Sequence, residues 1–159
     1  MTDGADRVRI VGITLDEHTV VRRSRDIEHE RAVAIFDLIE ENHFRPLSGI
    51  EGPFHLHLSV EEQRLCLEIE TPDRQKLERV VLPLASFRRV VRDYFLICES
   101  YYDAIRKLSP SQIEAIDMGR RGLHDEGAAL LKERLAEHVD IDKLTSRRLF
   151  TLLCVLHLR

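Results

Sequence analysis

Two neighbouring stretches of alternating apolar and polar residues constrain the fold of this chain more than any other feature of its sequence. Residues 54–60 and 65–70 each place an apolar side chain at every second position. Because successive side chains of a strand point to opposite faces, this pattern predicts an antiparallel hairpin with one buried face. With a two-residue loop at 62–63, the expected cross-strand pairs are Glu61 with Arg64, His57 with Glu68, and His55 with Glu70.

The remaining apolar patterns predict two further strands and four helices. The expected strands are 7–15 and 77–84, with Pro83 near the end of the second or on a sheet edge. The expected helices are 27–42 (with Ala32, Ile35, Phe36 and Ile39 on its apolar face), 86–108, 110–138, and a last one from Asp142 or Thr145 to the end. The order β-α-β-β-β-α-α-α predicts the α+β class: an antiparallel sheet of three to four strands packed against a C-terminal bundle of about three helices, in a single domain over residues 1–159. The place of the first strand within the sheet stays open.

The three C-terminal helices carry further local signals. The broad apolar surface of 86–108 predicts that this helix is central, and Ser109 to Gln112 form a capping box that starts the next helix. Three glycines follow within nine residues, at 119, 122 and 127, and predict either a break or close packing. The last helix is apolar nearly all round, so it is expected to be buried or to lie in a subunit contact.

Charge and cysteine usage narrow the class of protein. The formal net charge is −4, so no excess of basic residues favours nucleic acid or an anionic membrane as partner. The three cysteines, Cys66, Cys98 and Cys154, match no zinc or redox spacing and sit among apolar residues, which predicts buried, reduced thiols. The first six residues are polar and acidic, without the apolar core of a signal peptide. These features predict a cytoplasmic protein.

Basic clusters on two predicted helices are the main candidates for a ligand site. The first cluster combines Asp117, Arg120, Arg121 and His124, which helical spacing brings together and which could hold a carboxylate or phosphate; the alternative is that the arginines pair with Asp117 or Glu126. The second cluster, Arg88, Arg89 and Arg92, could line a phosphate site or form a solvated face.

Histidines beside carboxylates suggest two weaker sites. His55 and His57, opposite Glu70 and Glu68, could bind zinc, although ordinary cross-strand pairs produce the same pattern. His29, flanked by glutamates, could act as a base or belong to a helix start rich in acids. Dinucleotide, phosphate-loop, metalloprotease and serine-hydrolase motifs are missing from the sequence. We therefore assign no metal ligand and no cofactor, and leave open whether the chain is an enzyme.

Several stretches together resemble a known family. They are 26–35 (DIEHERAVAI), 93–102 (DYFLICESYY), 110–127 (PSQIEAIDMGRRGLHDEG) and 149–159 (LFTLLCVLHLR). The chain resembles, over nearly its whole length, a family of short alphaproteobacterial proteins that is itself uncharacterised. The resemblance implies a bacterial cytosolic protein of one domain, and it brings no activity, cofactor or catalytic residue.

Three hypotheses for function remain open. The apolar surplus at 95–98 and 149–158 favours a self-associating binding or regulatory module that is not an enzyme. The second hypothesis is a protein or enzyme that binds a small phosphate or carboxylate compound through Arg88, Arg92, Arg120, Arg121 and His124. The third is a metal enzyme that uses His55 and His57, or His29 and His124.

Overall fold

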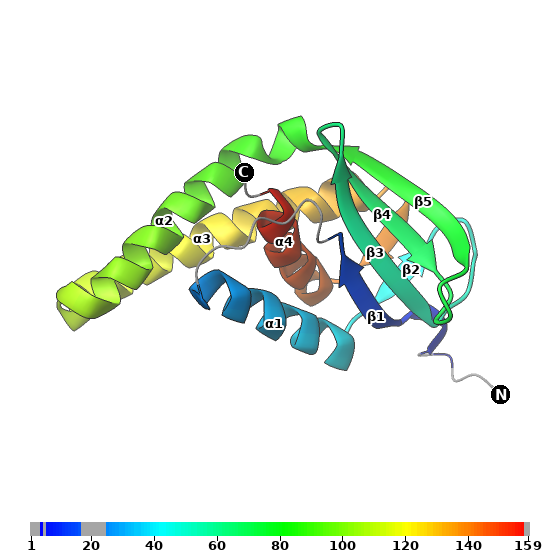
Figure 1. Ribbon diagram of the computed structural model, residues 1–159, viewed down its shortest axis with the longest axis horizontal. Helices are drawn as coiled ribbons and strands as arrows, with labels where there is room; N and C mark the ends of the chain where they lie inside the picture. The colour runs from blue at the N-terminus through cyan, green and yellow to red at the C-terminus, as the bar shows by residue number, and fades with distance from the viewer. Residues whose placement is uncertain (1–3, 5, 17–24, 158–159) are drawn as a thin grey trace.

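The computed structural model describes residues 4, 6–16 and 25–157. Figure 1 shows a curved sheet at one side and the helices at the other, with α2 and α3 running side by side away from the sheet. The helices are α1 (Arg25–Glu40), α2 (Arg88–Lys107), α3 (Pro110–Leu135) and α4 (Lys143–His157), with short 3-10 turns at Asp6–Val8 and Leu84–Phe87. This arrangement is the predicted α+β class, with three helices in the C-terminal half.

The main sheet has four strands in the order β1-β3-β4-β5. They are β1 (Ile10–Leu15), β3 (Phe54–Glu61), β4 (Arg64–Glu70) and β5 (Lys76–Pro83). The hairpin of β3 and β4 has the predicted register, with Glu61 opposite Arg64, His57 opposite Glu68 and His55 opposite Glu70. β5 is an edge strand, as the proline at its end predicts.

The prediction of a purely antiparallel sheet is wrong at one strand. β1 pairs with β3 in parallel, so the sheet is mixed. The reason lies in the connection, because the chain leaves β1, passes through α1, and returns to the sheet in the same direction. Asn42, which follows α1, links the end of this connection to β1. Its Oδ1 accepts a hydrogen bond from Ile10 N at 2.7 Å, and its Nδ2 donates one to Ile10 O at 2.9 Å.

A second, two-stranded sheet was not predicted. β2 (Phe44–Pro46) pairs antiparallel with β6 (Val139–Ile141). Each strand has three residues, which is too short for a recognisable alternation, and one ends in proline. The pairing ties the end of α3 to the region after α1.

The helix at the centre of the helical layer is α4, not α2. α4 lies between α1 and α3 and also contacts β3, whereas α2 packs mainly against α3. Residues 149, 150 and 152–156 of α4 are all buried inside the chain. The apolar side chains of this segment are therefore covered by other elements of the same chain. Of the two outcomes expected for the last helix, burial and a subunit contact, the structure shows burial.

The apolar face of α1 differs from the prediction. Ala34 and Leu38 are buried, whereas Phe36 is 67% exposed. α1 carries apolar residues on nearly all sides between 32 and 39, so its pattern alone does not fix the side that meets α4.

The cysteine prediction is confirmed. All three cysteines are buried and free. Burial raises the pKa of Cys98 to about 11, and burial also raises the pKa of Cys154, so both stay as thiols at neutral pH. Within the described residues, no helix combines the length and the apolar character needed to cross a bilayer.

Candidate functional site

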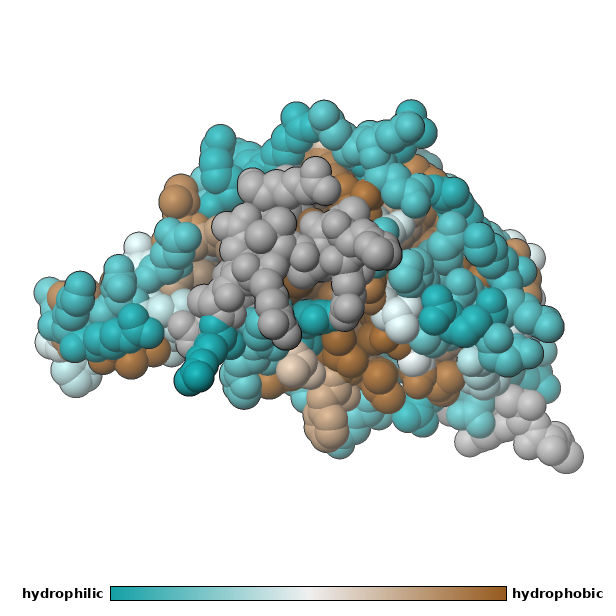
Figure 2. Space-filling view, viewed as in Figure 1, coloured by the Kyte–Doolittle hydropathy of each residue, from teal (hydrophilic) through white to brown (hydrophobic). Residues whose placement is uncertain are grey.

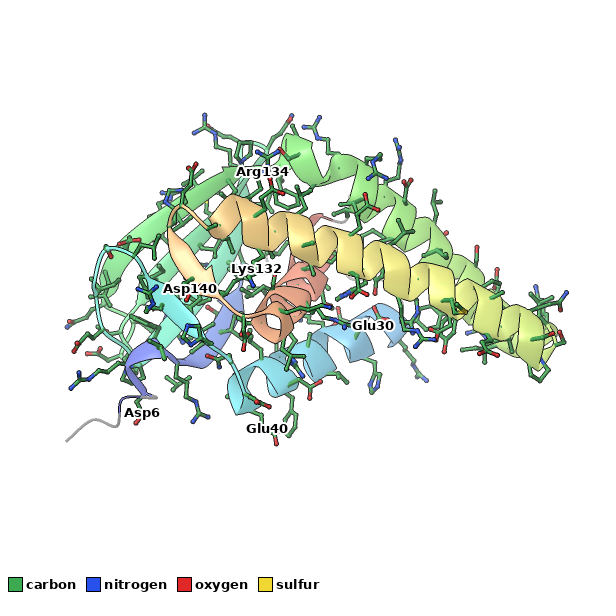
Figure 3. The ribbon with its side chains drawn as sticks, turned by 180° about the vertical axis from the view of Figure 1, so that it is seen from behind. Asp6, Glu30, Glu40, Lys132, Arg134 and Asp140 are labelled. Carbon is green, nitrogen blue, oxygen red and sulfur yellow. The ribbon has the colours of Figure 1, made fainter. Side chains whose placement is uncertain are left out.

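A hollow of about 590 Å³ opens between α1, α3 and α4. This volume falls in the range of small-molecule sites. Figure 3 shows Glu30 of α1 on the side of that helix that faces α3. The lining residues are His29, Glu30, Val33, Ala34, Asp37, Tyr94, Arg120, Arg121, His124, Leu144, Arg147, Arg148 and Thr151.

Arg120 is held firmly in the wall of the hollow. Its Nε and Nη2 donate to Asp117 Oδ1 at 3.1 and 2.7 Å, and its Nη1 lies 3.4 Å from Glu30 Oε1. Its guanidinium carbon also sits 4.3 Å from the centre of the Tyr101 ring. Tyr102 Oη donates to the same oxygen of Glu30 at 2.6 Å. This network links α3 to α1 and α2. Its two carboxylates neutralise the charge of Arg120.

Two other arginines of the hollow also face carboxylates. Arg121 Nε lies 3.2 Å from Asp117 Oδ2, and Arg147 Nη1 lies 3.4 Å from Asp125 Oδ1. Both pairs are partly exposed, so each contributes little to stability. Their charges are nevertheless largely balanced in place.

Arg148 differs from its neighbours. It is half-buried on α4, and no hydrogen bond or ion pair joins it to any residue that the structure describes. Its Nη1 is buried and has no hydrogen-bond partner in the part of the chain that the structure describes. A buried donor without an acceptor is costly, so this group is the feature of the hollow that most needs a ligand.

His124 is the second unsatisfied group of the hollow. Its Nε2 is 2.7 Å from Thr151 Oγ1, and its ring packs on Tyr94 and Phe150, each with a centroid distance of 5.3 Å. Its Nδ1 is buried and has no partner among the described residues. Burial, followed by the charge of Arg147, lowers the pKa of His124 to about 4, so the ring is neutral at pH 7.

The structure brings only one of the two predicted basic clusters into the hollow. Asp117, Arg120, Arg121 and His124 come together, as helical spacing predicts. The second cluster of Arg88, Arg89 and Arg92 lies elsewhere: Arg88 bonds Gln63, Arg89 bonds Glu126 and Asp93, and Arg92 lies 3.7 Å from Asp93. The five-residue anion site that includes Arg88 and Arg92 is therefore not assembled.

The histidines of the hairpin form hydrogen bonds with a threonine of β1. Thr14 Oγ1 lies 3.1 Å from His55 Nε2 and 2.7 Å from His57 Nδ1. The facing carboxylates are occupied by arginines, with Glu70 bonded to Arg74 and Glu68 lying 3.4 Å from Arg79. Across the described parts of the chain, no group of three or more histidine, cysteine, aspartate or glutamate side chains is placed to hold a metal ion. His29 lines the hollow together with His124, which the sequence could only suggest.

Sequence reasoning missed the contribution of α4 to the hollow. Arg148 and Thr151 were not candidates, and Glu30 was considered only as an acid beside His29. One signal was available, because Arg147 and Arg148 interrupt a helix that is otherwise almost entirely apolar. A charged residue on a buried helix needs a partner of opposite charge, so such a residue is a candidate for a binding site.

Comparison with known proteins identifies relatives but no activity. A protein of Rhodospirillum rubrum named a UPF0262 protein is 58% identical over 154 residues, which cover 97% of this chain and 95% of the relative. UPF0262 proteins of Erythrobacter litoralis and Xanthobacter autotrophicus are 56% and 54% identical, covering 95% and 98% of this chain and 97% and 95% of the relatives. No solved structure matches the chain. The model of one uncharacterised protein family matches residues 7–159, and the chain therefore belongs to that family, UPF0262.

Proposed function

We propose that this protein binds a small organic anion, with a carboxylate or phosphate group, in the hollow between α1, α3 and α4. The observation that carries the proposal is Arg148, a half-buried guanidinium that lines the hollow and forms no ion pair with a described residue. Arginine presents a planar set of donors that suits both carboxylate and phosphate.

The charges around the hollow support an anion rather than a cation. Four arginines and two carboxylates line the hollow, so the formal charge of its lining is positive. Arg120, Arg121 and Arg147 each lie within 4 Å of a carboxylate, whereas Arg148 has no such neighbour among the described residues. A bound acceptor would remove the cost of the unsatisfied guanidinium. We expect the guanidinium to turn toward the ligand when it binds.

A thermal-melting experiment tests the proposal. The probes are sodium acetate and inorganic phosphate, each titrated at pH 7 with chloride holding the ionic strength constant. We expect at least one probe to raise the melting temperature in a saturable way, because a ligand that binds only the folded state stabilises it. The rise should be lost in Arg148→Gln and retained in Arg92→Gln, whose arginine lies on α2 outside the hollow. An equal rise in both variants would refute binding at Arg148.

Self-association is a second proposal that one observation favours. Leu96 and Ile105 of α2, Leu108 just after α2, and Met118 of α3 are exposed. Figure 1 shows these two helices extending beyond the other elements, so their apolar side chains lack cover from the rest of the chain. Light scattering coupled to size-exclusion chromatography tests this proposal, and a monomer at tens of micromolar would count against it. The buried free thiols support a cytoplasmic location, which we also propose.

A further inference from the structure

Part of the exposed rim of the hollow is apolar. Val33 of α1 and Leu144 of α4 both line the hollow, yet they are 43% and 45% exposed. Phe36 lies one turn along α1 from Val33, on the same side of the helix, and is 67% exposed. Figure 2 shows hydrophobic surface along α1 and beside β1. Clustered apolar side chains at the edge of a cavity mark a contact with something apolar.

The inner wall adds apolar surface to this edge. Ala34 and Tyr94 line the hollow and are buried. Burial and the nearby Glu30 raise the pKa of Tyr94, so its ring carries no charge at neutral pH. Apolar groups therefore line the hollow both at its inner wall and at its rim.

The charges of the wall limit the ligand to one negative group. Glu30 and Asp37 line the hollow on α1, opposite α4. Arg120 already holds Glu30, and Asp37 has no ion pair with a described residue. A second negative charge on the ligand would lie near these carboxylates with no free arginine to meet it.

We infer that the ligand is an amphipathic monocarboxylate, with its carboxylate at Arg148 and an alkyl chain of several carbons leaving over Val33 and Leu144 toward Phe36. The inference rests on the proposed function, because it assumes that an anion occupies the hollow. It adds the chemical class of that anion.

A chain-length series tests the class of ligand. Acetate, butyrate, hexanoate and octanoate are titrated into the full-length protein by calorimetry at pH 7 and constant ionic strength. Each methylene that leaves water should tighten binding about fourfold. Octanedioate, which has the same length as octanoate and a second charge, should bind at least tenfold more weakly than octanoate.

Surface variants locate the alkyl chain. Phe36→Ser and Leu144→Ser should weaken octanoate binding at least threefold each. Phe36→Ser, which changes a residue outside the lining of the hollow, should leave acetate binding unchanged. Leu96→Ser is the matched control, because Leu96 is also an exposed apolar residue but lies on α2 outside the hollow. It should change the affinity for neither octanoate nor acetate. These residues are at the surface, so the variants should fold as the parent does.

The outcomes separate this inference from the proposed function. If acetate binds and depends on Arg148 while affinity stays flat along the series, the monocarboxylate class is wrong and the anion site stands. If octanoate binds equally well in Arg148→Gln, its carboxylate is not at Arg148 and both conclusions fall. If no carboxylate of the series binds, the inference is overturned. The phosphate titration then shows whether the hollow binds an anion at all.

Discussion

Gly127 of α3 lies directly against the ring of Phe150 on α4. A Cβ atom built on Gly127 would lie 2.1 Å from Phe150 Cζ, far inside contact distance. Phe150 is fully buried, and its ring also contacts His124 and Tyr94. The absence of a side chain at this point lets α3 approach α4, and this approach places His124 beside Thr151 in the hollow.

Substitution of this glycine should destabilise the protein. Gly127→Ala removes the conformational cost of a glycine in a helix, about 0.5–1 kcal/mol, but it forces Phe150 to move within a packed core. We expect a net loss of about 1–3 kcal/mol in the free energy of unfolding, measured by urea denaturation. Gly122→Ala is the matched control, because a Cβ there would meet nothing within 4 Å, and it should stabilise by about 0.5 kcal/mol. Equal effects of the two changes would contradict the packing described.

The start of α3 depends on Ser109. The Ser109 side chain accepts from Gln112 N, and Gln112 Oε1 accepts from Ser109 N at 3.1 Å, which completes the capping box. Ser109→Ala should lower the free energy of unfolding by about 1 kcal/mol. Ser100→Ala, in the interior of α2, provides the control and should be neutral or slightly stabilising. A neutral Ser109→Ala would show that the tip formed by α2 and α3 frays without global cost.

His124 should make stability depend on pH. Its pKa in the folded protein is about 4, below the ordinary 6.5, so the unfolded chain takes up a proton first as the pH falls. Its contribution is therefore fully present above pH 6.5 and is lost as the pH falls from about 6.5 toward 4. This term amounts to about 2 kcal/mol between pH 7 and pH 5.

The matched variant for this test is His124→Gln, whose amide can keep the contact with Thr151. The difference in free energy of unfolding between pH 7 and pH 5 should shrink by about 2 kcal/mol in this variant, as measured by urea titration at each pH. An unchanged difference would mean that His124 titrates normally in the folded protein.

Arg148 should cost stability when no ligand is bound. Arg148→Met removes a half-buried charge that lacks a partner among the described residues, and it should raise the free energy of unfolding by about 1 kcal/mol in anion-free buffer. Arg120→Met, which breaks contacts to Asp117 and Glu30, should instead lower it. Thermal and urea unfolding measure both. Destabilisation by Arg148→Met would indicate that Arg148 serves the fold rather than a ligand.

The hairpin was predictable because its signal is local. A period of two over residues 54–60 and 65–70 fixes both the buried face and the register, since a slip of one residue would turn every leucine to solvent. The capping box at Ser109 is equally local, and the structure confirms it. The glycines of α3 left two outcomes open, and contact with Ile97 and Phe150 at Gly119 and Gly127 explains why the helix continues.

The predictions of strand pairing and of the buried side of α1 were wrong or incomplete, because tertiary contacts determine both. The parallel pairing of β1 follows from the path of the chain through α1, and the pairing of β2 with β6 joins segments almost a hundred residues apart. Exposure of Phe36 depends on which side of α1 meets α4. None of these relations leaves a pattern within a single segment.

The residues of the site likewise fall into those that local spacing predicts and those that only tertiary packing brings together. Helical spacing was enough to group Asp117, Arg120, Arg121 and His124. Arg148, which has no partner among the described residues, and Glu30, which pairs with Arg120, come from other helices, so only the packing of the helices could bring them into the hollow.

The most direct test of the account is a crystal structure of the protein saturated with octanoate. The account predicts one molecule in the hollow between α1, α3 and α4, with its carboxylate on Arg148 and its chain passing Val33 and Leu144. An empty hollow at saturating octanoate, or a ligand held there without contact to Arg148, would contradict it.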